Sequence, residues 1–206
     1  MPDLPPLTEG SLSPDPLAML LAWLADAEAT GMRDPWAMTI ATAGSDGRPS
    51  ARTVLLRGVD ADGLRFYTNR GSLKGRQLAE NPRAQLLFHW RELGRQVCVH
   101  GSVEETSDAD SDAYFASRDR GSQLGAWASR QGVVIADRED LLRRVSEASE
   151  RFSGGDVPRP PYWGGYVVRP EAIELWQLGE HRLHDRFVYV RDGSAPGGWR
   201  TARLSP

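Results

Sequence analysis

The spacing of hydrophobic residues changes from helical to alternating within the first third of the chain. Asp15 and Pro16, typical of a helix N-cap and a first helical position, precede leucines at 17, 20, 21 and 24, which predicts an amphipathic helix ending near Gly31. Short runs rich in β-branched and aromatic residues then alternate with turn sequences such as 45–47. They predict strands at 38–42, 50–56, 64–68, 84–90 and 96–103, and one short helix that Ser72 caps and that ends at Asn81-Pro82.

Helical spacing returns in the second half and is followed by further strand patterns. We expect helices over about 108–117, 122–129 and 137–152, then strands at 165–168, 172–176, 187–191 and 199–203. The turns are typical of hairpins and not of crossover helices, so the fold class is mainly β with peripheral helices, a closed or nearly closed antiparallel barrel. Residues 1–14, rich in Pro, Ser and Gly, are expected to form a flexible arm, and 15–206 a single domain.

Composition narrows the class of protein. The 25 basic and 28 acidic residues give a net charge of −3 and are dispersed, which disfavours nucleic acid as a partner. Cys98 is the only cysteine, so no intrachain disulfide can form and a reducing compartment is expected. The apolar stretch 17–24 is too short to span a membrane, and the proline-rich start lacks a signal-peptide pattern, so we expect a cytoplasmic protein. The histidines lack zinc-site spacing, so no metal is expected.

The run 176–187 carries the strongest chemical signal. It places Arg182, His184 and Arg186 at every second position, which would put all three on one face of an extended strand. Two guanidiniums and an imidazole suit phosphate, carboxylate or a delocalised anion, and the imidazole can exchange a proton near neutral pH. The alternative is the solvated face of an edge strand. Trp176 and Phe187, at the two ends of the run, favour the interpretation that the run forms one wall of a ligand site.

Two further segments could hold anions. Arg52 and Arg57 are an odd number of positions apart, so a regular strand would point them to opposite faces and toward different contacts, unless they only reach past the strand ends to water. Thr68, Ser72 and Lys74 lie where a strand runs into a helix N-terminus, a geometry that can cradle a phosphate. The alternative there is an ordinary capped helix.

Two more candidates bear on ring and phosphate recognition. The amide of Gln96 could read the polar edge of a heterocycle, or could be a plain surface side chain. Tyr114, Arg118 and Ser122 recur at helix-compatible intervals, and a guanidinium between two hydroxyls suits a small phosphate ester. The alternative is a core tyrosine and a solvated arginine.

Taken together, the segments RTVLLR, FYTNRGSLKG, GRQVCV, YFASRDRGSQLGAWASRQ, YWGGY and ELWQLGEHRLHDRF resemble the pyridoxamine 5′-phosphate oxidase family. They occur in the family's order from about Asp34 to Pro206. The resemblance implies an FMN-binding split β-barrel and a homodimer with FMN at the subunit interface. It also implies FMN-dependent oxidation of pyridoxamine or pyridoxine 5′-phosphate to pyridoxal 5′-phosphate, with O₂ as acceptor and H₂O₂ as product.

The resemblance also implies roles for individual residues. Arg182 and His184 would hold the pyridine ring of the substrate and take the catalytic roles. The residues implied for FMN are Arg52, Tyr67, Thr68, Lys74, Gln96, Gln131, Trp176 and Arg186, and those implied for the substrate phosphate are Arg57, Tyr114, Arg118 and Ser122.

Three positions depart from the usual family pattern. Arg57 stands where lysine is usual, Leu73 where arginine is common and Gly132 where serine is common. Two other functions remain open. One is a related flavin oxidase of secondary metabolism, of the phenazine-pathway type, and the other is a non-catalytic protein that binds FMN or pyridoxal phosphate. The joint presence of Tyr114, Arg118, Ser122, Arg182 and His184 argues against the phenazine-pathway type.

Overall fold

The computed structural model describes residues 5–206. Helix α1 (Pro16–Ala29) begins as its sequence predicts, because the Asp15 carboxylate accepts a hydrogen bond from the Leu17 amide at 2.9 Å and Pro16 occupies the first turn. Leu20, Leu24 and other apolar residues of α1 are buried in the same core as the sheet. The helix therefore covers one face of the barrel.

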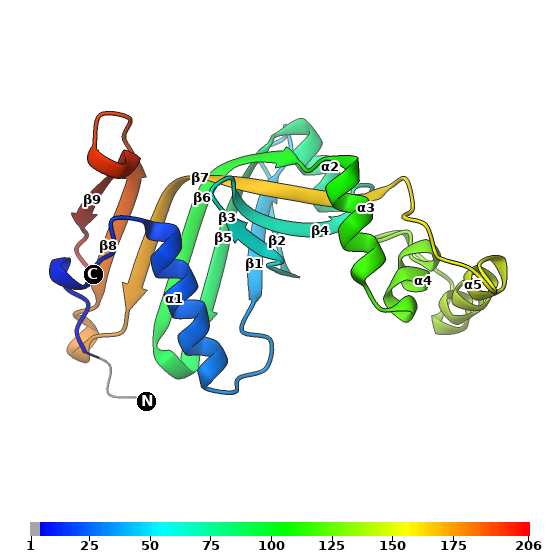
Figure 1. The fold of residues 1–206 in the computed structure, drawn as a ribbon, viewed down its shortest axis with the longest axis horizontal. Helices are drawn as coiled ribbons and strands as arrows, with labels where there is room; N and C mark the ends of the chain where they lie inside the picture. The colour runs from blue at the N-terminus through cyan, green and yellow to red at the C-terminus, as the bar shows by residue number, and fades with distance from the viewer. Residues whose placement is uncertain (1–4) are drawn as a thin grey trace.

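Within residues 5–206, nine strands form one antiparallel sheet in the order β2-β1-β5-β6-β7-β4-β3, with β8 paired to β7 and β9 paired to β8 (Figure 1). Their bounds are β1 Ala37–Ala43, β2 Pro49–Leu55, β3 Gly58–Asp60, β4 Gly63–Asn69, β5 Arg83–Trp90, β6 Arg95–Glu105, β7 Trp163–Gln177, β8 Asp185–Arg191 and β9 Trp199–Arg203.

The barrel is split where strand β7 changes its pairing partner halfway along its length. Its first half pairs with β4, from Asn69↔Trp163 to Leu64↔Val168, and its second half pairs with β8. Two shorter strands were predicted here, and the structure joins them into one. The register of β6 shifts between His100 and Gly101, and a Cβ at Gly101 would lie 2.0 Å from the Arg169 carbonyl oxygen. The shift and this close approach let β7 change partner without breaking.

Alternation along the strands builds the core. Phe88 on β5, Val97 and Val99 on β6, and Leu175 on β7 are fully buried and lie on the face that α1 covers. A second, smaller cluster contains Phe115 and Trp163, away from α1. The molecule thus has a main core under α1 and a satellite core under its later helices.

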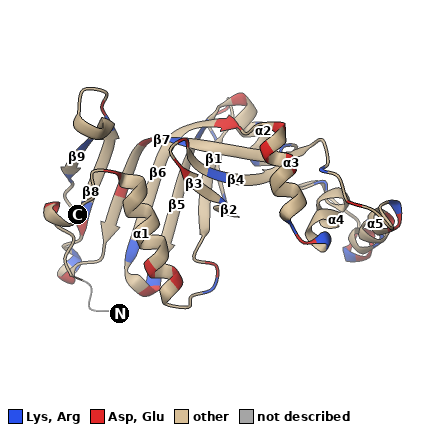
Figure 2. Ribbon diagram, viewed as in Figure 1, with Lys and Arg blue, Asp and Glu red and all other residues tan. Residues whose placement is uncertain are grey.

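The remaining helices lie to one side of the barrel. They are α2 (Leu73–Glu80), α3 (Asp108–Ser117), α4 (Arg120–Ala128) and α5 (Arg138–Arg151), and short 3₁₀ turns occur at Glu9–Ser11, Arg91–Leu93, Glu180–Arg182 and Pro196–Gly198. Helices α3–α5 lie at the opposite end of the molecule from β8 and β9 (Figure 1). Charges of both signs are interspersed over these elements (Figure 2). Within residues 5–206, no helix has the length and apolar character needed to cross a membrane.

The start of the chain differs from the expected flexible arm where the structure describes it. Leu7 is 5% exposed and belongs to the main core, and the Tyr189 hydroxyl donates to the Ser13 carbonyl at 2.9 Å. The apolar Leu7 side chain and the free backbone groups around it find partners on β8 and β9, which the sequence pattern does not reveal. Residues 1–4 of the expected arm lie outside the described residues.

Candidate functional site

A cavity opens between β2, the end of β4 and the start of α2. It has a volume of about 370 Å³, and it is lined by Arg52, Thr53, Val54, Leu55, Arg57, Tyr67, Thr68, Lys74, Tyr114, Arg118, Gln131 and Trp163. A neighbouring cavity of about 370 Å³ shares Tyr67, Thr68, Arg118, Gln131 and Trp163 and adds Ser122 from α4. The shared lining makes the two cavities parts of one site.

Lys74 lies in the wall of this site and is the only lysine in the chain. It is 5% exposed, and its Nζ donates to Thr68 Oγ1 at 3.0 Å, Ser72 Oγ at 3.2 Å and Gln131 Oε1 at 2.9 Å. Ser72 also caps α2, since its hydroxyl accepts from the Gly75 amide at 3.3 Å. The predicted strand-to-helix cradle is therefore formed, and the cap and the ammonium share one hydroxyl.

Arg52 lies beside Lys74 and is also held by neutral groups. Its guanidinium donates to the Ile40 carbonyl at 3.2 Å, to Thr42 Oγ1 at 2.7 Å and to the Ser50 hydroxyl. Burial lowers the pKa of Arg52, and burial together with the charge of Arg52 lowers the pKa of Lys74 to about 8. Within residues 5–206, neither cation forms an ion pair with a carboxylate. Both cations are therefore held only by neutral groups and have no charged partner of opposite sign among the described residues.

A second cationic pair lines the same cavity. Arg118 Nη1 is buried and lacks a hydrogen-bond partner within residues 5–206, and the guanidinium lies 4.9 Å from the Trp163 ring centroid. The pKa of Arg118 is lowered, chiefly by burial, with a contribution from the charge of Arg57. An unpaired buried donor is costly, and the side chain that carries it lines the cavity.

The structure corrects how these residues come together. Strand β2 ends at Leu55, so strand alternation does not extend to Arg57, and Arg52 and Arg57 line one cavity. Tyr114, Arg118 and Ser122 do not share a helix, because Arg118 is extended at the end of α3 and Asp119 caps α4. The three residues still reach the joined site.

Aromatic rings form one wall of the site. The Tyr67 and Tyr114 ring centroids lie 3.9 Å apart, and Tyr67 stacks on Trp163 at 5.6 Å. A Cβ at Gly165 would lie 2.6 Å from Tyr67 Cε1, so only glycine lets this ring lie flat on β7. Trp163 has no role among the predicted site residues. Its position before Gly164-Gly165 is the signal that could have revealed an aromatic wall.

The remaining candidates form a second group on the other half of the sheet. Gln96 pairs in register with Trp176, and Trp176 with Arg186, across β6, β7 and β8. Arg186 Nε donates to Glu174 Oε1 at 2.8 Å, and this bond raises the pKa of Arg186. The His184 and Trp176 ring centroids are 4.6 Å apart. None of these residues lines the cavity described above.

The predicted single-face row of Arg182, His184 and Arg186 is wrong. Strand β8 begins only at Asp185, and Glu180–Arg182 form a 3₁₀ turn in which His181 and Arg182 have φ of 51° and 66°. The alternation of side chains along a strand does not continue through a turn of this kind. The turn therefore determines the positions of the exposed Arg182 and the half-buried His184.

The structure thus brings together one part of the predicted site and leaves the other at a distance. The residues it gathers are Arg52, Arg57, Tyr67, Thr68, Lys74, Tyr114, Arg118, Ser122 and Gln131. Those on the separate surface are Gln96, Trp176, Arg182, His184 and Arg186. Among the described residues, no three His, Cys, Asp or Glu side chains gather into a possible metal site.

The antiparallel sheet, split at β7, and its flanking helices define a protein of the split β-barrel class. Residues 24–152 match the family model described as pyridoxamine 5′-phosphate oxidase, and 163–206 match the pyridoxine 5′-phosphate oxidase C-terminal dimerisation region. The chain belongs to the pyridoxine/pyridoxamine 5′-phosphate oxidase family.

Individual relatives agree with this assignment. The chain is 56% identical over 200 residues to the pyridoxine/pyridoxamine 5′-phosphate oxidase of Rubrobacter xylanophilus, covering 97% of this chain and 91% of that one. It is 54% identical to the enzyme of the same name from Burkholderia multivorans, covering 97% and 93%. PhzG from Burkholderia lata, solved with tetrahydrophenazine-1-carboxylic acid, is 34% identical with a TM-score of 0.90, covering 99% and 98%.

Proposed function

We propose that this protein is an FMN-dependent oxidase that converts pyridoxamine and pyridoxine 5′-phosphates to pyridoxal 5′-phosphate. The observation that carries the proposal is the presence of two cationic pairs without carboxylate partners in one cavity, Arg52 with Lys74 and Arg57 with Arg118. A reaction between two phosphorylated molecules needs two such positions, since a phosphate monoester carries about −1.5 to −2 charges at neutral pH.

The residues fit the phosphate of FMN at the first pair. Lys74 is buried among hydroxyl and amide oxygens, and the helix N-terminus of α2 adds backbone donors beside it. A bound phosphate would neutralise the buried Lys74 and the half-buried Arg52 beside it. Thr68 and Gln131, which bind Lys74 and each other, would then also contact the cofactor, with Tyr67 alongside.

The second pair fits the substrate phosphate. Arg118 lines the cavity with a guanidinium that has no carboxylate partner, Arg57 is an exposed lining residue, and Tyr114 and Ser122 supply hydroxyls. Arg57 replaces the more usual lysine with a planar fork of donors, which suits a phosphate at least as well as a point charge does. The stacked rings of Tyr67, Tyr114 and Trp163 give the site an apolar wall for planar groups.

A second copy of the chain would complete the site. Gln96, Trp176, Arg182, His184 and Arg186 lie on a different surface from the cavity, so one chain does not present both groups to one ligand. Trp176 to Arg186 fall within the match to the C-terminal dimerisation region. In a homodimer the partner's copies of these residues would meet the flavin edge and the pyridine ring.

When bound, FMN supplies the redox chemistry, accepting a hydride from the C4′ carbon of the substrate and being reoxidised by O₂. The protein then has to place the substrate, and the site must admit the water that releases ammonia when the amine substrate becomes the aldehyde. Arg182 and His184 would orient the pyridine ring, with His184 able to donate or accept a proton. Arg186 would place a positive charge near the part of the cofactor that gains electrons.

A phenazine-type oxidase is the second candidate, since PhzG superimposes with a TM-score of 0.90 at 34% identity. Oxygen consumption by the purified protein with added FMN separates the functions. We expect turnover with pyridoxamine 5′-phosphate and H₂O₂ as a product. Turnover only with a reduced phenazine precursor would support the second candidate, and FMN binding without turnover of either would support a storage or sensing protein.

A further inference from the structure

The turn that carries Arg182 and His184 has an unfavourable backbone conformation. His181 and Arg182 are consecutive non-glycine residues with positive φ, and a Cβ at Gly179 would lie 1.9 Å from the Leu183 carbonyl oxygen. Such backbones persist only where neighbouring groups fix them. The position of Arg182 and His184 therefore depends on what holds this turn.

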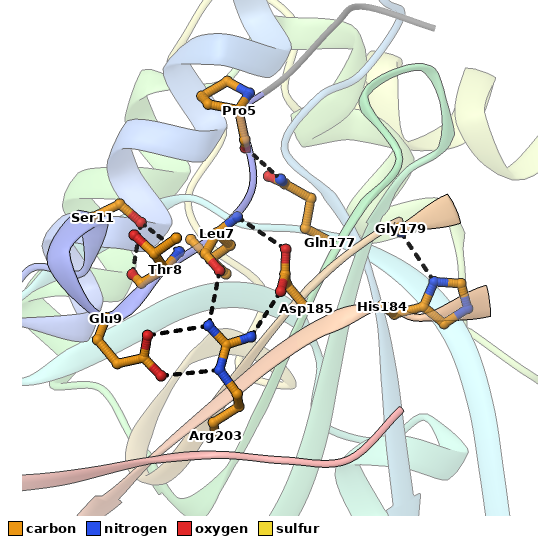
Figure 3. A network of polar contacts seen from close by, with 10 residues as sticks. All are labelled: Pro5, Leu7, Thr8, Glu9, Ser11, Gln177, Gly179, His184, Asp185 and Arg203. Atoms are coloured by element: carbon orange, nitrogen blue, oxygen red, sulfur yellow. Dashed lines mark hydrogen bonds and ion pairs between the residues drawn. The ribbon is translucent and has the colours of Figure 1, made fainter. Parts of the chain in front are cut away.

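Contacts within the turn are few. The Leu183 amide donates to the Glu180 carbonyl at 2.8 Å. The Gly179 amide donates to His184 Nδ1 at 3.2 Å (Figure 3). Leu183 is 71% exposed, so the turn has little apolar anchoring of its own. The main restraint has to come from the base of the turn.

The start of the chain crosses that base. Gln177 and Asp185 are paired in register where β7 ends and β8 begins. Gln177 Nε2 donates to the Pro5 carbonyl at 2.8 Å, and the Leu7 amide donates to Asp185 Oδ2 at 3.1 Å (Figure 3). Residues 5–7 thus bridge the two strands at the level where the turn leaves them, and the buried Leu7 side chain fixes this bridge in the core.

Arg203 on β9 holds the bridge in place. Its guanidinium donates to Asp185 Oδ1 at 2.8 Å, to the Leu7 carbonyl at 3.3 Å and to both oxygens of Glu9 at 2.9 and 3.2 Å (Figure 3). It also lies 4.3 Å from the Phe187 ring centroid. The hydrogen bond from Arg203 lowers the pKa of Glu9 to about 2. One guanidinium therefore joins the first segment of the chain to the residue that follows His184.

We propose that Arg203, together with Glu9, is a positioning residue that fixes the 179–184 turn through Asp185 and residues 5–7. The proposal rests on the proposed function, in which Arg182 and His184 of this turn meet the substrate. Arg203 binds Asp185 at the base of the turn and does not line the cavity that contains the two proposed phosphate positions. Its loss should leave FMN binding intact and slow the step that needs an oriented substrate.

The test uses anaerobic stopped-flow reduction of the FMN-loaded protein by pyridoxamine 5′-phosphate. In Arg203→Gln we expect the limiting rate of flavin reduction to fall roughly tenfold or more, since small misplacements of orienting groups carry losses up to about a hundredfold. The dissociation constant of FMN should stay within about twofold, and Arg203→Lys should recover part of the rate by restoring the charge. Arg200→Gln, on the same strand with an exposed side chain, is the matched control and should match wild type.

Glu9→Gln removes the ion pair with Arg203 by a change at an exposed residue. It is the alternative test variant if Arg203→Gln folds poorly. It should change the rate in the same direction, and the double variant should be no slower than Arg203→Gln, because the two residues act as a unit. A limiting rate equal to wild type in both single variants would overturn the proposal while leaving the oxidase function intact.

Hydrogen exchange of the apo protein gives a readout that does not depend on activity. Arg203→Gln should speed exchange of the Gly179 and Leu183 amides, with β5 and β6 unchanged. Unchanged exchange in the turn would also overturn the proposal. A wild-type protein that binds FMN but is not reduced by pyridoxamine 5′-phosphate would instead overturn the proposed function, and with it the role given to Arg203.

Discussion

Replacing Lys74 with Met tests the anion site at its most buried cation. Methionine keeps an unbranched side chain of similar length, so packing against Thr68 and Ser72 changes little, while the charge and three donors are lost. We expect two opposite effects. FMN should bind more weakly, because a charge-assisted phosphate contact is lost. The apoprotein should become more stable, because folding no longer buries the Lys74 charge and Arg52 no longer has a cationic neighbour.

The magnitudes follow from the structure. A charge-assisted hydrogen bond in a shielded site is worth about 1.5–3 kcal/mol, which corresponds to roughly a 10- to 150-fold loss of FMN affinity. In the apoprotein the pKa of Lys74 is lowered from 10.5 to about 8, which corresponds to at most about 3 kcal/mol of destabilisation below that pH. The unfolded chain binds the proton more tightly, so apoprotein stability should rise between pH 8 and 10.5, and Lys74→Met should abolish this rise.

Fluorescence titration with FMN measures the affinity, and urea denaturation of the apoprotein across pH measures the stability. Because the chain has a single lysine, protein labelled with ¹³C at lysine Cε gives one signal for direct titration of Lys74. Arg76→Met is the matched control, because it removes a positive charge from the exposed side of α2. An FMN affinity equal to wild type in Lys74→Met would refute the cradle, as would an ordinary lysine pKa in the apoprotein.

Three further changes separate the parts of the site. Arg182→Leu should slow anaerobic flavin reduction at every substrate concentration while FMN stays bound; reduction as fast as wild type would remove Arg182 from the site. Arg118→Met should raise the dissociation constant of the product pyridoxal 5′-phosphate by roughly 10- to 150-fold, because it removes donors from the second anion position only. FMN affinity should stay unchanged, and isothermal titration with pyridoxal 5′-phosphate checks the first value. Gly165→Ala should lower the free energy of unfolding by about 1–3 kcal/mol, because the alanine Cβ would lie 2.6 Å from the Tyr67 ring. An unchanged midpoint of urea denaturation would contradict this tight packing.

The local pattern of the sequence was sufficient for most elements of the fold. Hydrophobic alternation and turn residues placed the hairpin strands, and the Asp15 and Ser72 caps marked the starts of two helices. The joining of β7 into one strand was not predicted, because Pro170 reads as a strand end. In the structure Pro170 lies beside a register shift, which lets the ladder continue past it. That compensation comes from the partner strand and is not visible in the local sequence.

The candidate site was predicted only in part, for a physical reason. Residues in one strand or helix terminus, such as Thr68, Ser72 and Lys74, were correctly grouped because local geometry alone decides their neighbours. The row of Arg182 and His184 was misjudged because its conformation depends on contacts with residues 5–9 and 203, far away in the sequence. Local spacing carries no information about such contacts.

A mixed-dimer experiment tests the central claim that two copies of this chain build one oxidase site. Protein carrying Arg57→Met and Arg118→Met lacks the substrate-phosphate position of the cavity, and Arg182→Leu lacks the orienting group of the turn. Each should oxidise pyridoxamine 5′-phosphate very slowly by oxygen consumption. After subunit exchange at equal concentrations, half of the dimers are mixed and each has one intact site, so activity should recover to about a quarter of wild type. A mixture no more active than the average of the two variants would contradict the account, because it would place both groups of residues in one chain's site or outside the site altogether.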